Sequence, residues 1–179
     1  MTFQAADTVY ESQVVGYVGN RAIEGPTFAQ PKALNSADAA YNVFGSAFTQ
    51  TAGAGNDGYA EAGGAGVSFA GILWNPKEHS SFGAAGNPLA DTITLPNEST
   101  AGLVLQTPGV FVTFSTAANI GDGVVFDDTT GALAAIAPGA LPAVGQTQII
   151  GASVVRCNVL ADEVGIIQLT GSTDMLAGV

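Results

Sequence analysis

The side chains of this chain that could do chemistry are few and scattered. Among 179 residues there is one histidine and one cysteine, so a nucleophile–base pair or a zinc site lacks its usual ligands. His79 precedes Ser80 and Ser81, but sequence neighbours do not form a catalytic triad. Cys157, in the apolar run ASVVRCNVL, is expected to be a buried structural thiol. The sequence therefore predicts a protein with no enzymatic activity and no cofactor.

Three carboxylates, Asp122, Asp127 and Asp128, occur together in GDGVVFDDTTGAL. Carboxylate oxygens could bind Ca²⁺, but this spacing does not match an EF-hand loop. Asp followed by Gly or Thr is common in hairpin turns, so a turn is favoured over an ion site and no metal ligand is predicted. Asp91 and Glu98 could in principle be the carboxylate pair of a glycosidase, but two carboxylates in an acidic protein are weak evidence for one.

The charge balance excludes several classes of partner. Four Lys and Arg stand against 15 Asp and Glu, and only 11% of residues are charged, against about 25% in a typical protein. Four cations cannot supply affinity for a phosphate backbone, so no nucleic acid is expected. No apolar run approaches the length of a membrane span, and the N-terminus lacks the features of a signal peptide. We therefore expect synthesis in the cytoplasm. The surface is expected either to expose uncharged residues such as Ser, Thr, Asn, Gln, Gly and Ala or to be buried in large part against partners.

Short apolar runs separated by turn residues predict an all-β domain. The expected strands are 67–74, 92–97, 101–106, 109–115, 124–127, 132–136, 148–157 and 163–171. Asp128 to Gly131 is expected to be a tight turn with glycine in the left-handed conformation. About nine strands at this spacing indicate a single β-sandwich, a jelly-roll-like domain or a small β-barrel.

Residues 1–35 are predicted to be an extended N-terminal arm in front of a β-rich domain at 36–179. Pro26 and Pro31 disfavour a helix or a central strand there. A loose tail and an arm laid across a neighbouring subunit both remain open. The residues that a bound arm would offer to its partner are Tyr17, Arg21, Ile23, Phe28 and Lys32.

The segment 35–63 allows two interpretations. A short helix could begin at an N-cap such as Asp38 and carry one apolar stripe, formed by Tyr41, Phe44 and Phe48. Alternatively, a strand could be centred on Val43 and Phe44. The Gly/Ala-rich region around 51–66 is expected to be a loop, and it lacks the Lys-Ser/Thr pair of a phosphate-binding loop.

Two further aromatic residues are candidates for a contact surface. Trp74 could anchor an interface, where tryptophan is enriched, or it could cover the core. Phe111 lies on the half-apolar face of the strand at 109–115, as expected in a sandwich or at a subunit contact.

The order of the C-terminal segments resembles the cement, or decoration, proteins that stabilise the heads of tailed bacteriophages. GDGVVFDDTTGAL is followed by a Pro/Gly loop, then GQTQIIGASVVRC, then EVGIIQLTG. In that family, G-D-x-V, T-G-x-L and G-A-x-V patterns close a small β-domain. VVGYVGNRAIEGPTFAQP is similar to the family's extended arm. The resemblance covers residues 12–32 and 108–170.

This resemblance implies a structural virion protein on the outer surface of an assembled capsid. Such a protein cements adjacent major capsid subunits against internal DNA pressure, as a homo-oligomer (dimer or trimer) at lattice symmetry axes. The capsid or subunit interface would then include Tyr17, Arg21, Ile23, Phe28, Lys32, Trp74 and Phe111. Other virion subunits (tail tube, head completion or fibre) and a carbohydrate-binding module are the alternatives.

Overall fold

The computed structural model describes residues 16–51, 58–64, 68–75, 94–156 and 158–178. The expectations for His79, Asp91, Cys157 and the first 15 residues lie outside these ranges. Within them the chain forms β-strands and one turn of 3-10 helix at Ala39–Tyr41 (η2), which confirms the all-β prediction. None of the described helical residues forms a helix long and apolar enough to cross a membrane.

The strands follow one another along the chain and belong to one mixed sheet. Their order across the sheet is β1-β3-β2-β4-β5-β9-β8-β6-β7, with β10 paired to β8. Their bounds are β1 Phe28–Leu34, β2 Ala47–Gln50, β3 Tyr59–Ala62, β4 Phe69–Leu73, β5 Thr100–Thr113, β6 Gly123–Asp127, β7 Leu133–Ile136, β8 Gln146–Arg156, β9 Val164–Thr170 and β10 Met175–Ala177.

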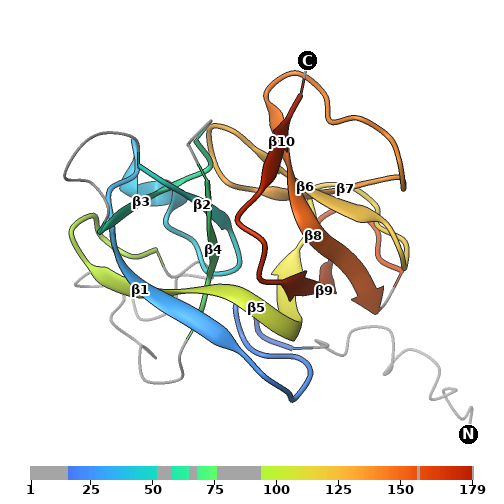
Figure 1. Ribbon diagram of the computed structural model, residues 1–179, viewed down its shortest axis with the longest axis horizontal. Coiled ribbons are helices and arrows are strands. Elements are labelled where there is room, and N and C mark those ends of the chain that lie inside the picture. Colours follow the sequence, from blue (N-terminus) through green and yellow to red (C-terminus); the bar gives the residue numbers. More distant parts are fainter. Residues whose placement is uncertain (1–15, 52–57, 65–67, 76–93, 157, 179) are drawn as a thin grey trace, which may run out of the picture.

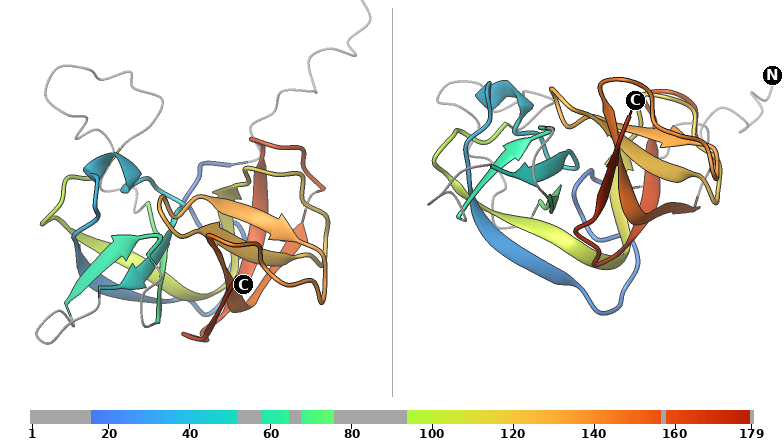
Figure 2. Two further views of the ribbon diagram at one scale, coloured as in Figure 1. Left: turned by 90° about the horizontal axis from the view of Figure 1, so that it is seen from above. Right: turned by 45° about the horizontal axis from the view of Figure 1, so that its top comes forward.

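The sheet closes on itself at two places, and each closed part forms one lobe of the molecule. β1 pairs with β3 on one edge and with β5 on the other, which joins β1, β3, β2, β4 and β5 into a ring. In the second lobe a bridge between Phe114 and Leu133 brings the start of β7 back to the end of β5. Figures 1 and 2 show the two lobes side by side, with β5 running from one into the other. Closure leaves few exposed sheet edges.

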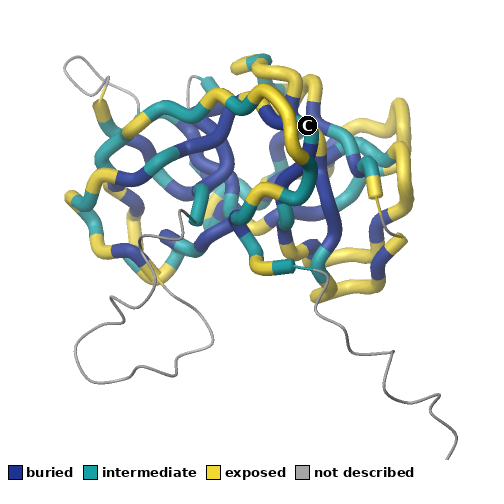
Figure 3. Tube along the Cα trace, turned by 90° about the horizontal axis from the view of Figure 1, so that it is seen from below, coloured by how far each residue is buried: buried dark blue, intermediate teal, exposed yellow. Residues whose placement is uncertain are grey.

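Each lobe encloses apolar side chains, and the two cores meet. Leu34, Phe48 and Leu103 belong to the cluster of the first lobe, whereas Phe114 and Phe126 belong to that of the second. The larger cluster also includes side chains of β2 and β4 from the first lobe, namely Ala47, Phe69 and Ile72. Figure 3 shows the buried segments of both lobes inside a shell of exposed turns. Each large buried side chain contributes about 1.5–3 kcal/mol by leaving water.

One continuous strand, β5, replaces the two strands expected at 101–106 and 109–115. Its pairing with β9 shifts register between Thr107 and Val110. Pro108 has no N–H to donate to a ladder, and Gly109 allows another backbone to approach closely, so the strand bulges there without ending. The bulge lets a 14-residue strand bend and serve both lobes.

The first strand of the sheet begins at Phe28, before the predicted boundary between the arm and the β-rich domain at residue 35. Phe28–Leu34, assigned to the arm from sequence, forms β1 and pairs with β5. Pro31 is accommodated because β3 pairs with β1 only at Ala33 and Leu34, so the missing N–H falls where that edge of the strand has no sheet partner.

Neither interpretation of 35–63 describes that segment fully. The Asp38 side chain does cap a helix, accepting a hydrogen bond from the Ala40 N–H at 2.9 Å, but the helix ends after one turn. The strand begins at Ala47, later than the predicted centre, and β3 lies within the Gly/Ala-rich region. The β6–β7 hairpin and the β8–β9 pair agree with the prediction.

Candidate functional site

Five of the seven predicted interface residues line one hollow, here called the Tyr17 groove. Its volume is about 810 Å³, and its lining includes Tyr17, Arg21, Ile23, Trp74, Asn75 and Phe111. The groove lies where the N-terminal segment crosses β5 and the end of β4. Phe28 and Lys32 do not line it. They lie further along β1, where the Lys32 Nζ donates a hydrogen bond to Gln50 Oε1 at 3.4 Å.

The backbone of residues 19–23 is fixed to β5 of the same chain. The Gly19 N–H donates to the Phe111 carbonyl at 2.8 Å, and the Phe111 N–H donates to the Asn20 carbonyl at 3.0 Å. The Ala22 N–H donates to the Gly109 carbonyl at 2.8 Å. This part of the predicted arm therefore lies on its own domain, where the hydrogen bonds hold the groove-lining side chains in place.

Two glycines make this close crossing possible. Gly19 has a φ of +80° and a β-carbon there would lie 3.1 Å from the Leu73 carbonyl oxygen, so an L side chain would be strained and crowded. A β-carbon at Gly109 would lie 2.7 Å from Ile23 Cγ1. Because residue 109 has no side chain, the Ile23 side chain can pack directly against the backbone of β5.

The groove combines aromatic surface with one cation. Tyr17 is 75% exposed, and Trp74 is half-buried with its ring packed against the larger core cluster. Arg21 makes a 3.7 Å ion pair with Glu24, and its side chain is 43% exposed. An exposed pair of this kind contributes little to stability, so Arg21 is free to exchange Glu24 for an acidic group on a partner.

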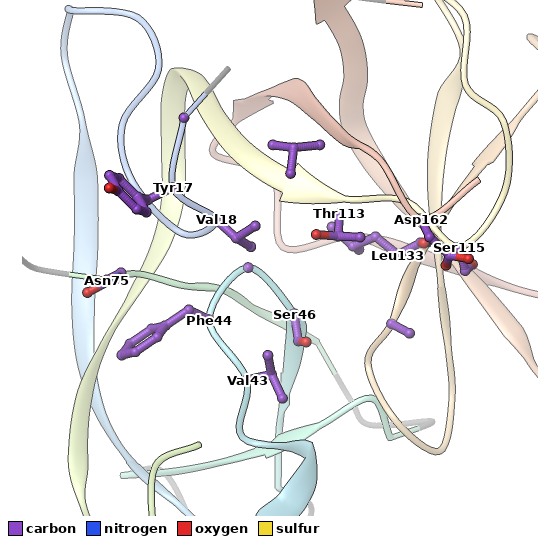
Figure 4. Close-up of a pocket in the computed structure, with 14 residues that line it drawn as sticks. Tyr17, Val18, Val43, Phe44, Ser46, Asn75, Thr113, Ser115, Leu133 and Asp162 are labelled. Atoms are coloured by element: carbon purple, nitrogen blue, oxygen red, sulfur yellow. Dashed lines mark hydrogen bonds between the residues drawn. The ribbon is translucent and has the colours of Figure 1, made fainter. Parts of the chain in front are cut away.

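A second hollow meets the groove at Tyr17. It has a volume of about 510 Å³ and draws its walls from both lobes. Figure 4 shows Tyr17, Val18, Val43 and Phe44 on one side of it and Thr113, Leu133 and Asp162 on the other. Most of these side chains are apolar, so the pocket is suited to an apolar side chain of a partner.

Sequence reasoning missed this pocket because its walls come from six separate parts of the chain. Val43 and Phe44 were noted only as residues of a possible helix or strand, and no sequence pattern indicated that they lie near Leu133. The pairing of Phe114 with Leu133 and the contacts around β5 create the pocket.

Two of the three carboxylates in this segment, those of Asp122 and Asp127, accept hydrogen bonds within turns. Asp127 Oδ1 accepts hydrogen bonds from the Thr129 N–H at 3.0 Å, the Thr130 N–H at 2.8 Å and the Thr130 hydroxyl at 2.9 Å. Partial burial acts to raise the pKa of Asp127, but these hydrogen bonds favour the ionised form and hold the pKa below its ordinary value. Asp122 Oδ2 accepts a bond from the Asn119 N–H at 2.8 Å. The turn interpretation is confirmed.

The described part of the chain shows no cluster of side chains suited to a metal ion. In those residues no three His, Cys, Asp or Glu side chains gather in a way that could hold a metal ion. The aromatic residues of the Tyr17 groove are Tyr17, Trp74 and Phe111.

Comparisons with known proteins agree with a structural role. A family model described as structural cement protein (E217 gp24/Pam3 gp6) matches residues 5–170. A chain from a structure titled "The capsid of Myoviridae Phage XM1" superposes with a TM-score of 0.58 at 15% identity, covering 95% of this chain and 98% of that one. At that identity the similarity shows a shared fold. No curated protein matches the sequence.

Proposed function

The chain belongs to the phage structural cement protein family, and from this premise we propose that it binds the outer surface of an assembled capsid. The family is structural and not enzymatic, which gives the protein a structural role in the virion in association with the major capsid protein. In our proposal the chain bridges adjacent major capsid subunits and holds them together against the outward pressure of packaged DNA. It is made in the host cytoplasm and joins the capsid from outside.

The observation that supports this proposal most is the gathering of aromatic residues and Arg21 at the Tyr17 groove. Residues of these types dominate the binding energy of protein interfaces. The apolar pocket beside the groove offers a place for a side chain of the capsid protein. An acidic exterior is compatible with this location, because the packaged DNA lies on the other side of the shell.

The fold suits a protein that must carry load. The segment that lines the groove is hydrogen-bonded to β5, and β5 is a member of both closed lobes. A pull on the groove is therefore distributed over backbone hydrogen bonds of the whole sheet. Many copies on one lattice reinforce each other, so a modest affinity for each copy is sufficient.

Co-sedimentation with shells assembled from the cognate major capsid protein tests the proposal. We expect the wild-type chain to sediment with intact shells and to raise their melting temperature. Replacing both Tyr17 and Arg21 by Ala should weaken binding about tenfold or more, as expected for interface anchors. Ile120→Ala is the matched control, because Ile120 is also exposed but lines neither hollow.

A deletion adds a separate test of the N-terminal segment. Removing residues 1–15 leaves β1 and the groove in place, whereas a deletion to residue 32 would remove most of β1 and unfold the first lobe. We expect the shorter deletion to stay folded and to bind shells more weakly. If the wild-type chain does not bind intact shells, or assembles by itself into rings or tubes, the cement role is wrong and a tail subunit takes its place.

A further inference from the structure

The Tyr17 groove and the apolar pocket beside it adjoin each other and can be filled by one occupant. Gly16, Tyr17 and Asn75 line both of them, so the two hollows meet along these three residues. Their volumes are about 810 and 510 Å³, and each is as large as a site for a drug-sized ligand. Together they offer room for several residues of an extended protein segment.

The side of the pocket opposite Tyr17 carries one carboxylate. Asp162 lines the pocket there (Figure 4), and the described residues that line it include no Lys or Arg. The Asp162 N–H donates to the Phe114 carbonyl at 2.7 Å, which fixes the backbone of this residue at the pocket wall. Among the described residues, none makes an ion pair with the Asp162 carboxylate. The pocket therefore offers a negative charge that no cation of its described lining neutralises.

The groove on the other side of Tyr17 carries a cation. Arg21 lines the groove and not the pocket. Its partner Glu24 has a side chain that is 95% exposed, so the pair is weak and Glu24 can turn away into solvent. The planar guanidinium then presents its donors to another carboxylate. The order along the two hollows is thus Asp162, the apolar walls of the pocket, Tyr17 and Arg21.

This order of charges selects the occupant. A segment that placed a carboxylate at Asp162 or a cation at Arg21 would bring like charges together. A segment without charge would remove water from both groups and offer no partner in return. An apolar side chain is required between the two charges, because most of the pocket wall is apolar. The matching segment therefore has a basic residue, a large apolar residue and an acidic residue along its length.

We propose that the two hollows bind an extended segment of the major capsid protein in which a large apolar residue stands between a basic and an acidic one. The apolar side chain enters the pocket between Tyr17 and Leu133. The basic residue pairs with Asp162, and the acidic residue takes the place of Glu24 at Arg21. This inference rests on the proposed capsid function and adds to it the charge pattern by which the capsid segment is recognised.

Capped peptides that carry this pattern test the inference without any shell. The probe is Lys-Gly-Phe-Gly-Glu, made also with two or three glycines on each side of Phe, and the comparison peptides replace Lys by Gln, Glu by Gln or Phe by Ala. Trp74 is the one tryptophan of the chain and lines the groove, so its fluorescence reports binding. Each charge should tighten binding about two- to fivefold over Gln, as in exposed ion pairs. Replacing Phe by Ala should weaken binding about tenfold or more.

Variants of the chain assign each peptide charge to its partner. Asp162→Asn removes the charge, and Asn tolerates the left-handed φ of +64° at this position. This variant should lose the preference for Lys over Gln and keep the preference for Glu, whereas Arg21→Gln should do the reverse. Asp174→Asn and Arg156→Gln are the matched controls, because both residues are exposed and line neither hollow. Both controls should keep both preferences, and circular dichroism should show all four variants folded.

The outcomes separate this inference from the proposed function. A wild-type chain that binds the Lys and Gln peptides equally well, or binds none of the peptides, would overturn the inference. An Asp162→Asn chain that still prefers lysine would overturn it too. Neither result bears on co-sedimentation with shells, which tests the proposed function by itself. A chain that selects the probe peptide but does not bind shells would overturn the capsid protein as the source of the segment.

Discussion

We expect Asn42→Ala to be among the single substitutions that destabilise the fold most, although Asn42 lines neither the Tyr17 groove nor the apolar pocket beside it. Its side chain is fully buried. The amide nitrogen donates to the Leu95 carbonyl at 2.8 Å and to Asn97 Oδ1 at 2.9 Å. The amide oxygen accepts from the Ser36 hydroxyl at 2.6 Å. These bonds fix the position of the segment in which Val43 lines the apolar pocket.

The size of the effect follows from the buried polar groups that Asn42→Ala leaves without a hydrogen-bond partner. The Leu95 carbonyl and the Ser36 hydroxyl each lose a buried partner, and an unsatisfied buried polar group costs about 1–3 kcal/mol. We expect the free energy of unfolding to fall by roughly 3 kcal/mol, which in a domain of this size lowers Tm by about 6–12 °C. The pocket beside Tyr17 should loosen at the same time, and binding to shells should weaken with it.

Equilibrium denaturation in urea, followed by circular dichroism, measures this change. Asn119→Ala is the control, because Asn119 is an exposed asparagine whose side chain makes one long bond, of 3.5 Å, to Asp122, and it should cost less than about 0.5 kcal/mol. A loss below about 1 kcal/mol for Asn42→Ala would show that the buried network does not hold the first lobe together, and the reasoning would be wrong.

Three other changes test separate features of the fold. Gly131→Ala should destabilise the chain by about 1–3 kcal/mol in a thermal melt, because Gly131 has a φ of +72° and a β-carbon there would meet the Ala47 carbonyl oxygen. Phe114→Ala should cost about 3–5 kcal/mol in urea denaturation, because it empties the centre of the larger core. The lowered pKa of Asp127 stabilises the native state above about pH 4, and this contribution is lost as the pH falls through the folded-state pKa. Asp127→Asn should therefore be less stable than wild type at neutral pH, and the difference should shrink in melts at acid pH.

The elements that could be predicted from sequence are those whose signals are local. The hairpin from Val124 to Ile136 was predictable because the residue types that its turn requires lie next to one another in the sequence. The turn uses the Asp127 carboxylate as a hydrogen-bond acceptor and places Gly131 in the left-handed conformation. The β8–β9 pair was predictable for the same reason, since two apolar runs flank a short turn.

The elements that were missed depend on contacts between distant residues. β1 carries Pro31 and no clean alternation, and it becomes a strand because β5 lies beside it, with Phe28 opposite Gln106. β10 is three residues long, too short for any period to be visible. Closure of the two lobes has no sequence signal, because it depends on which strands meet.

The interface role of the candidate residues stays a prediction, and their geometry could not be predicted from the sequence. Tyr17 was chosen as an aromatic residue of the arm, Arg21 as one of its two cations and Trp74 as an interface anchor, and all three line one groove in the structure. The segment that carries Tyr17 and Arg21 was expected to reach over a neighbour, yet its backbone is bonded to β5. The composition could suggest a contact surface, but only the fold could place it.

Cryo-electron microscopy of shells assembled from the cognate major capsid protein, with and without this chain, tests the central claim most directly. The account predicts added density on the outer surface of the shell, bridging adjacent capsid subunits, with the Tyr17 groove turned toward them. An intact shell that gains no density in the presence of the chain would contradict the account.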